Sequence, residues 1–340
     1  MNSWIAIAIC VFFGFVVTFF SGFIVIPWLH KKQSGQAIPF SHVFRKRSFA
    51  PTMGGILIAA GIAITLSVIL ITDKLLGGDI VSVGIVDSDT EKIKLFSGIL
   101  MAFSYAFIGF FDDYIKASGK RSFGLSVRQR VIMEIIVITG YLWSLNMTGA
   151  TYISLPFAGN TDTGLFFWVI GPAVMYLTIH SVRLSDSTDG LCAASGVVFA
   201  ACGTVIALVK GLFGAGLLCS AAAGTLAGFL VWNLYPSKVR LGSTGSMLLG
   251  GIIIAAAYCV NMPWLTALAG ISYMAETVTY AMHIIRYKSS GGKKLLRRVP
   301  LNLHFEECGW KANRIVTAFS AMNITGSLIA ILLVIAGRPE

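Results

Sequence analysis

Apolar runs of about 20 residues recur along the whole chain, and they limit its fold more than any other feature. A helix of that length crosses the hydrocarbon core of a bilayer and satisfies its own backbone hydrogen bonds there. The chain is 56% hydrophobic and 12% charged, whereas soluble proteins are roughly 25% charged. The sequence therefore predicts an all-α polytopic membrane protein. Too little chain lies between the runs for a soluble domain, so we expect one integral-membrane domain over residues 1–340.

The apolar runs predict ten spans, whose bounds are approximate. They cover residues 4–28, 53–72, 95–111, 131–148, 165–182, 191–209, 212–231, 245–261, 264–285 and 315–336. The first run lacks a basic n-region and a small-residue cleavage site, so it is not typical of a removable signal peptide. Of the 26 Lys and Arg residues, 21 fall on one set of alternating loops and five on the other. The positive-inside rule then predicts that both termini lie outside and the basic loops lie in the cytoplasm.

The net charge of +11 is by this prediction a cytoplasmic feature, which could hold anionic lipid headgroups or serve an anionic substrate. The acidic residues of the outer loop 73–91 are expected to be solvated. Glu134 and Glu276 lie within spans, where an acidic side chain is costly and indicates a functional site. Glu134 is near a span end and could reach water, whereas Glu276 is expected to line an interior surface. The six cysteines form no CxxC pattern and are expected to be packing residues.

Two adjacent carboxylates, Asp112 and Asp113, follow directly on the third apolar run, and Lys116 comes shortly after them. Adjacent carboxylates repel each other, so they are tolerated where a cation lies between or beside them. The alternative for such a pair is a solvated helix end.

Four segments on the predicted cytoplasmic side carry residues suited to chemistry. They are residues 45–55, 112–125, 183–190 and 235–246. Asp186 and Asp189 in the third segment would share one helical face, and the Gly/Ser/Thr-rich turn 242–246 could offer backbone N–H groups to a phosphate. Each segment alone could merely set topology or cap a helix. Together they indicate a site for Mg²⁺ and a phosphorylated substrate.

Five motifs of the chain resemble those of the polyprenyl-phosphate N-acetylhexosamine-1-phosphate transferases. They are Pro51-Thr52-Met53-Gly54-Gly55, Gly109 to Lys116, Leu184-Ser185-Asp186 with Asp189-Gly190-Leu191, Gly242 to Gly251, and Pro300 to Glu306 followed by Gly309-Trp310. The last motif is similar to the histidine-motif loop of the branch that uses phospho-N-acetylmuramoyl-pentapeptide (phospho-MurNAc-pentapeptide). The order of the motifs and the ten spans resemble that branch from end to end.

The resemblance implies transfer of phospho-MurNAc-pentapeptide from UDP-MurNAc-pentapeptide to undecaprenyl phosphate, with Mg²⁺ as the cofactor. The products would be UMP and lipid I, a precursor of peptidoglycan. It also implies a multi-pass protein of the bacterial plasma membrane with its active site on the cytoplasmic face. The expected partners are the two substrates and the lipid bilayer, with no nucleic acid. A homodimer is compatible with this prediction.

The resemblance also assigns roles by position. Asp112 and Asp113 match the family's aspartate pair at the lipid-phosphate and metal end, so Mg²⁺ is assigned to them, and Asp186 and Asp189 match aspartates beside the nucleotide site. The predicted catalytic residues are Asp112, Asp113, Lys116, Asp186, Asp189 and His304. The predicted substrate-binding residues are Lys46, Arg183, Arg240, Gly242, Ser243, Gly245 and Ser246.

Several positions depart from the family pattern. Ser243 stands where the family has a metal-binding aspartate, and a hydroxyl is a poorer Mg²⁺ ligand than a carboxylate. The other departures are Arg183 for an asparagine, Ser187 and Thr188 for a glycine and a leucine, Asn302 and Leu303 for two histidines, and Ala37-Ile38-Pro39 where an arginine is expected.

These departures leave other functions open. One is a catalytically impaired or altered-specificity relative that binds polyprenyl phosphate or a nucleotide sugar. Another is a transferase that uses UDP-GlcNAc. A channel or transporter is disfavoured because the acidic and basic side chains gather on one side of the predicted membrane.

Overall fold

The computed structural model describes residues 3–33, 50–81, 88–118, 124–292 and 294–337. The helices in these ranges are α1 (Ser3–Gln33), α2 (Gly55–Leu75), α3 (Ser88–Ala117), α4 (Val127–Met147), α5 (Phe167–Ser185), α6 (Leu191–Lys210), α7 (Phe213–Asn233), α8 (Gly242–Cys259), α9 (Leu265–Leu268), α10 (Ile271–Ser289), α11 (Leu301–Glu307) and α12 (Ala312–Ala336). The strands β1 (Tyr152–Leu155) and β2 (Gly159–Asp162) form an antiparallel hairpin, and a short 3₁₀ turn (Gly164–Phe166) leads into α5.

In the described ranges nine helices, α1 to α8 and α12, are long and apolar enough to cross a membrane. The prediction of an all-α polytopic membrane protein is confirmed.

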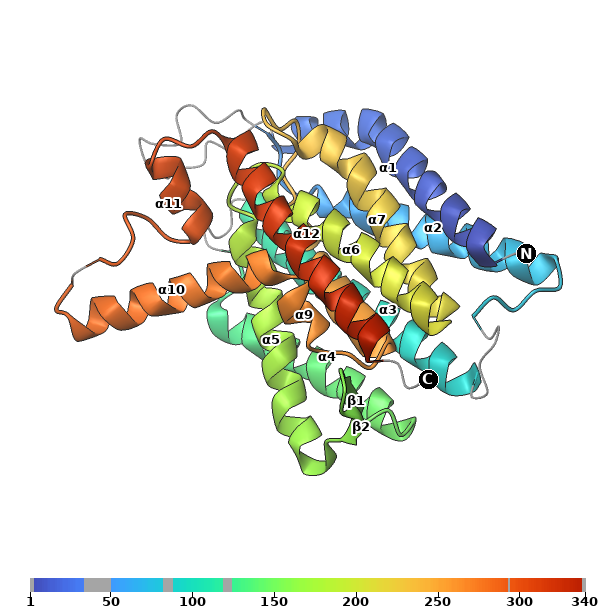
Figure 1. Ribbon diagram of the computed structural model, residues 1–340. Helices are drawn as coiled ribbons and strands as arrows, with labels where there is room; N and C mark the ends of the chain where they lie inside the picture. Colours follow the sequence, from blue (N-terminus) through green and yellow to red (C-terminus); the bar gives the residue numbers. More distant parts are fainter. Residues whose placement is uncertain (1–2, 34–49, 82–87, 119–123, 293, 338–340) are drawn as a thin grey trace.

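The segment predicted as a span over residues 264–285 has a different structure. It is divided into the short helix α9 and the longer helix α10, with Gly270 between them. α10 is not among the nine apolar helices, and it ends in the basic residues Arg286 and Lys288. Figure 1 shows α10 pointing away from the rest of the bundle. The span was predicted from the apolar residues of the whole segment taken together. Such a count registers neither the break at Gly270 nor the polar second half of the segment.

The chain still passes from one end of the bundle to the other between α8 and α12. At the end that carries the hairpin, Trp264 Nε1 donates a hydrogen bond to Ser154 O at 2.8 Å. Further along, Glu276 of α10 accepts a hydrogen bond from Asn302 N at 3.2 Å, and α12 begins soon afterwards. Together α9 and α10 therefore make one passage between the two ends of the bundle.

α8 lies inside the bundle, and each of its residues from Thr244 to Cys259 is buried. Glycines let the neighbouring helices approach closely. A Cβ on Gly224 of α7 would lie 2.1 Å from Val11 O of α1, and a Cβ on Gly55 of α2 would lie 2.1 Å from Gly245 N of α8. Small residues at such crossings are typical of helix packing in membranes, where van der Waals contact drives association.

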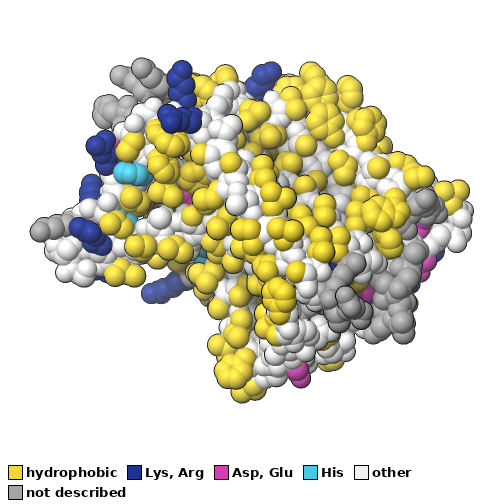
Figure 2. Space-filling model, in the orientation of Figure 1, with side chains coloured by type: hydrophobic (Ala, Val, Ile, Leu, Met, Phe, Trp, Pro, Cys, Tyr) yellow, Lys and Arg dark blue, Asp and Glu magenta, His cyan; other side chains and the backbone are white. Residues whose placement is uncertain are grey.

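The outer surface of the bundle is apolar, as expected for helices that face lipid. Phe12 and Ile24 of α1 are 70% and 76% exposed, and Ile136 of α4 is 65% exposed. Figure 2 shows hydrophobic side chains over most of the visible face, whereas Lys and Arg gather around α10 and α11. The molecule is a multi-pass membrane protein with a localised basic region.

Candidate active site

The aspartate pair ends the apolar part of α3 at its junction with the start of α8. Asp112 is fully buried and Asp113 is 4% exposed, so the alternative of a solvated helix end is wrong. Gly109 permits this junction, because a Cβ there would lie 2.3 Å from Ser243 O. The start of α2 joins the same place, since Gly54 N donates to Arg240 O at 2.9 Å. Three of the motifs predicted to form a site therefore meet.

Asp112 is held by four donors from three parts of the chain. Lys116 Nζ donates to Oδ2 at 2.5 Å, and the Arg130 guanidinium donates to Oδ1 at 2.8 Å. Leu125 N donates to Oδ1 at 2.9 Å, and Ser243 Oγ donates to Oδ2 at 2.7 Å. Two of the four donors are cations, so the protein itself neutralises the charge of Asp112.

Asp113 caps the start of α8. Ser243 N donates to its Oδ1 at 3.0 Å, and Thr244 donates to its Oδ2 from N at 2.8 Å and from Oγ1 at 2.7 Å. The first N–H groups of a helix lack partners within the helix and carry a partial positive charge, which favours an anion. Asp113 therefore occupies two of the N–H groups that the sequence predicted for a phosphate.

Gly242, the first residue of α8, is required by this arrangement. Its φ angle is +74°, which favours glycine, and a Cβ there would lie 2.7 Å from Asp113 Oδ2. Ser243 touches both carboxylates, and its Oγ also accepts a hydrogen bond from Lys116 Nζ at 3.2 Å. Ser246, by contrast, donates its hydroxyl to Gly242 O at 2.9 Å within its own helix. Gly245 serves the contact between α2 and α8.

Asp186 follows the last residue of α5, and Asp189 lies in the turn that leads to α6. The prediction that the two share one helical face is wrong, because α5 has ended before Asp186. Burial raises the pKa of Asp186 to about 7, against the opposing effect of the Arg240 guanidinium, and the charges of Asp113 and Asp189 raise it further. Asp186 is therefore electrostatically connected to the aspartate pair.

Arg183 faces α4, where its Nη1 lies 4.0 Å from Glu134 Oε1. His180 Nε2 lies 3.7 Å from the other oxygen, Glu134 Oε2. Glu134 is 1% exposed, and neither of its oxygens has a hydrogen-bond donor within the described residues. The expectation that Glu134 reaches water is wrong, and it provides instead a buried counter-charge for Arg183.

Two positions that depart from the family pattern, Ser187 and Asn302, contact each other. Asn302 Nδ2 donates to Ser187 Oγ at 2.5 Å, and Asn302 N donates to Glu276 Oε1 at 3.2 Å. Glu276 is fully buried, as expected for a side chain on an interior surface. Leu303, beside Asn302, is also buried. These departures join the turn after α5 to α10 and α11.

His304 lies on α11, apart from the aspartate pair. Its Nδ1 accepts a hydrogen bond from Arg297 N at 3.3 Å, and its Nε2 lies 3.8 Å from Cys308 Sγ. Within the described ranges its hydrogen-bond partners thus belong to its own segment, so the structure does not bring it to the pair. Lys46 and Ala37-Ile38-Pro39 lie outside the described residues.

Arg130, Thr244 and Asn233 are residues of the site that the sequence did not single out. In the sequence, Arg130 was counted only among the basic residues of the loops, and Thr244 was only one residue of the Gly/Ser/Thr-rich turn 242–246. Asn233 Oδ1 accepts from Gly190 N at 3.1 Å, and its Nδ2 donates to Val239 O at 2.9 Å, so it joins the start of α6 to the loop before α8. An asparagine at the end of an apolar run was the signal that the sequence offered for Asn233.

The donor set of the aspartate pair does not fit the predicted Mg²⁺ site. Mg²⁺ requires oxygen ligands with lone pairs directed at the ion. Asp112 accepts four hydrogen bonds and Asp113 accepts three, which leaves one of about eight lone-pair positions. The part of the chain that the structure describes contains no group of three or more His, Cys, Asp or Glu side chains that could hold a metal ion.

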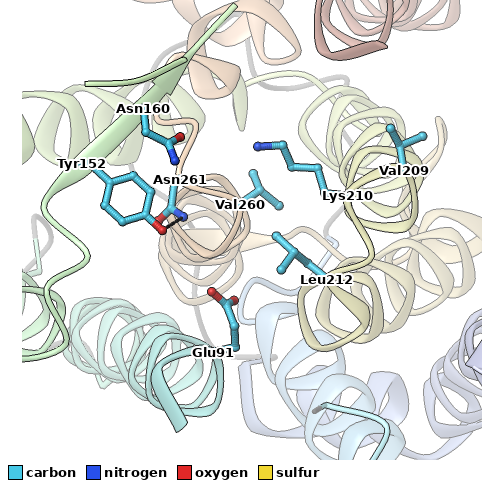
Figure 3. Close-up of a pocket in the computed structure, with 8 residues that line it drawn as sticks. All are labelled: Glu91, Tyr152, Asn160, Val209, Lys210, Leu212, Val260 and Asn261. Atoms are coloured by element: carbon cyan, nitrogen blue, oxygen red, sulfur yellow. Dashed lines mark hydrogen bonds between the residues drawn. The ribbon is translucent and has the colours of Figure 1, made fainter. Parts of the chain in front are cut away.

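A polar pocket of about 360 Å³ (Figure 3) lies at the end of the bundle opposite the aspartate pair. Glu91 of α3 and Lys210 of α6 both point into it. Glu91 and Asp112 are 21 residues apart on α3, a distance of about 30 Å along a helix, so this pocket is not part of the site. Glu91 Oε1 accepts from the fully buried Lys94 at 2.7 Å. The expectation that Glu91 is simply solvated is therefore wrong.

Comparisons with known proteins show the family to which the chain belongs. Residues 95–261 match the family described as glycosyl transferase family 4, and this range contains the aspartate pair, the turn after α5 and α8. The chain is 33% identical over 316 residues, which are 90% of each chain, to phospho-N-acetylmuramoyl-pentapeptide-transferases of Bacillus mycoides (strain KBAB4), Bacillus thuringiensis (strain Al Hakam) and Bacillus cereus (strain AH187). Together with the membrane-spanning helices, these matches define a membrane-embedded glycosyl transferase. Within that class, the chain belongs to the phospho-N-acetylmuramoyl-pentapeptide-transferase family.

Proposed function

We propose that the protein transfers phospho-MurNAc-pentapeptide from UDP-MurNAc-pentapeptide to undecaprenyl phosphate. An oxygen of the lipid phosphate attacks the phosphorus that carries the sugar, the bond between the two phosphates of UDP breaks, UMP leaves, and lipid I forms. One observation carries the proposal. A buried aspartate pair joins α3 to the start of α8 in a chain that matches transferases of this name over 90% of its length.

The residues at the junction suit this reaction. In-line phosphoryl transfer depends on positioning and on charge neutralisation more than on covalent chemistry by the protein. We assign Lys116 and Arg240 to the diphosphate of the substrate. Lys116 lies beside Asp112, and the charge of Arg240 acts on Asp186. Arg183 is assigned a positioning role, because its guanidinium is directed toward Glu134.

Asp186 is assigned the proton transfer. Its pKa of about 7 lets it exchange a proton at neutral pH, and a general base works best when its pKa lies near the working pH. A phosphate monoester loses its second proton near pH 6, so Asp186 is suited to take that proton from the acceptor before attack.

We also propose that the end of the bundle with the aspartate pair faces the cytoplasm of a bacterium, at the plasma membrane. The support is the excess of Lys and Arg on the loops at that end. The water-soluble UDP substrate would reach this end from the cytoplasm, and undecaprenyl phosphate would reach it from the bilayer.

The test is an assay of the purified full chain in detergent with UDP-MurNAc-pentapeptide and undecaprenyl phosphate, each omitted in turn. UMP and a lipid-linked product should appear only when both are present. A parallel reaction with UDP-GlcNAc tests the sugar, and faster release of UMP from UDP-GlcNAc would replace the proposed substrate. Absence of UMP from folded protein with both nucleotide sugars would contradict the proposed activity.

A further inference from the structure

The aspartate pair is balanced in charge by groups of the protein. Lys116 and Arg130 form ion pairs with Asp112 at 2.5 Å and 2.8 Å. Asp113 faces the positive end of α8 through the N–H groups of Ser243 and Thr244. Two adjacent carboxylates need nearby positive charge, and here two side-chain cations and a helix terminus supply it.

The geometry of the donors leaves little room for a metal ion. The four bonds to Asp112 occupy both lone pairs of each oxygen, and the three bonds to Asp113 leave one lone pair on Oδ1. A divalent ion bound to both carboxylates would have to displace Lys116 or Arg130. Displacement would leave a cation beside the new ion in a mostly buried site, which is unfavourable.

Ser243 is the residue that completes this closed arrangement. Its hydroxyl donates to Asp112 Oδ2 at 2.7 Å and accepts from Lys116 Nζ at 3.2 Å, while its N–H donates to Asp113. A hydroxyl can donate and accept at once, whereas a carboxylate in this position would only accept and would add a third negative charge. The side chain at residue 243 therefore sets whether the pair needs an external cation.

We propose that this protein binds its diphosphate substrate without a divalent metal ion, and that Lys116 and Arg130 hold the aspartate pair in place of one. This proposal rests on the proposed function for the identity of the substrate, but it concerns the pair itself. It predicts that the free protein has no Mn²⁺ or Mg²⁺ site at the pair. It also predicts that the binding of UDP-MurNAc-pentapeptide does not depend on added metal.

The first measurement is Mn²⁺ binding to the full chain in detergent, followed by electron paramagnetic resonance, without substrate. Wild-type protein should leave Mn²⁺ free at about 1 mM, a concentration at which even a weak specific site would be occupied. The matched variant is Ser243→Asp, which restores a third carboxylate and should bind about one Mn²⁺ per chain. Stoichiometric Mn²⁺ binding by the wild type that disappears in Asp112→Asn would overturn the proposal.

The second measurement is the Kd of UDP-MurNAc-pentapeptide by calorimetry, with EDTA and with Mg²⁺. The two values should agree within about twofold, or about 0.4 kcal/mol. Affinity about tenfold tighter with Mg²⁺ would overturn the proposal even if the free protein binds no Mn²⁺, because the metal would then arrive with the nucleotide. If the substrate does not bind under either condition, the proposed function fails, and the Mn²⁺ measurement still decides the state of the pair.

Discussion

At the scale of single residues, Asp113 connects the fold to the site. Its carboxylate accepts three hydrogen bonds from the first turn of α8, and it lies beside Asp112, which accepts four. Helix caps usually come from the residue just before the helix. Here the cap comes from a helix 130 positions earlier in the chain, so one side chain both fixes the start of α8 and fixes how α3 and α8 meet.

Substitution of this cap should lower stability in a graded way. Asp113→Asn places an amide group against N–H donors, which costs about 1–3 kcal/mol, and Thr244→Val removes only the hydroxyl bond, which costs about 1 kcal/mol. Thermal unfolding in detergent should therefore rank wild type above Thr244→Val and Thr244→Val above Asp113→Asn.

Ser246→Ala is the matched control, because that hydroxyl bonds only within α8. It should unfold at nearly the wild-type temperature. If Asp113→Asn unfolds at the same temperature as Ser246→Ala, the capping role of Asp113 is wrong.

The pKa of Asp186 predicts a pH dependence with a definite sign. Because burial raises it to about 7, the carboxyl is neutral below that pH and charged above it. A base must be charged to accept a proton, so the transfer rate should rise about tenfold from pH 6 to pH 8. Asp186→Asn should be slower and should lack this rise, which steady-state assays in a constant-ionic-strength buffer can check. A variant with the wild-type profile would assign the rise to another group.

The same shift affects stability in the opposite direction. The folded protein holds the proton of Asp186 more tightly than the unfolded chain, whose carboxyl has the ordinary value of 3.8. The contribution of Asp186 to stability is therefore greatest at low pH and decreases as the pH rises toward 7. Between about pH 6 and pH 7, the transfer rate should therefore rise while the stability of the folded protein falls.

At the scale of elements, the crossing of α2 and α8 determines whether the site can form. Gly55 and Gly245 lie at the crossing, and the backbone bond from Gly55 N to Leu241 O at 3.0 Å joins the same two elements. The motif that contains Gly55 follows a basic loop and precedes an apolar run, so its packing role is visible only when α8 is placed beside it.

Gly55→Ala should therefore disrupt the crossing. The new Cβ would lie 2.1 Å from Gly245 N, which is backbone and cannot move aside alone. Overpacking of this kind typically costs about 1–3 kcal/mol. Loss of detergent-stable, monodisperse protein and a lower unfolding temperature are the expected results.

Gly140→Ala on α4 is the matched control for this prediction. A Cβ at Gly140 would meet nothing within 4 Å, so the change should be neutral or should stabilise the helix by up to about 1 kcal/mol. Equal behaviour of the two variants would contradict the close contact of α2 and α8.

At the scale of the whole molecule, the orientation in the membrane can be tested with a cysteine that the chain already has. Cys308 is exposed and the other five cysteines are buried. Cys308 follows α11, toward the end with the aspartate pair, so a membrane-impermeant maleimide should label it in inside-out vesicles and not in intact spheroplasts. Cys308→Ser should remove the label from inside-out vesicles, and adding Asn160→Cys, on β2 at the other end of the bundle, should give labelling in intact spheroplasts. Labelling of Cys308 in intact spheroplasts would reverse the orientation.

Most of the architecture could be predicted from the sequence, because bilayer thickness ties an apolar run directly to a helix. The segment 264–285 was the exception, since a span count does not register the break at Gly270 or the polar half of α10. Within the site, Asp112 and Asp113 could be found from their position at the end of an apolar run. Their partners Arg130 and Thr244 could not, because tertiary packing alone brings α4 and α8 to the end of α3.

The cap on α8 also changes how retention of the aspartate pair across related genes is to be interpreted. Natural selection can keep Asp113 for the stability of the fold alone, since its carboxylate caps the start of α8. A descendant that had given up catalysis and kept only a binding role would still be stabilised by that carboxylate. The presence of the pair therefore traces ancestry and foldability, and it does not by itself distinguish a working enzyme from a silent one.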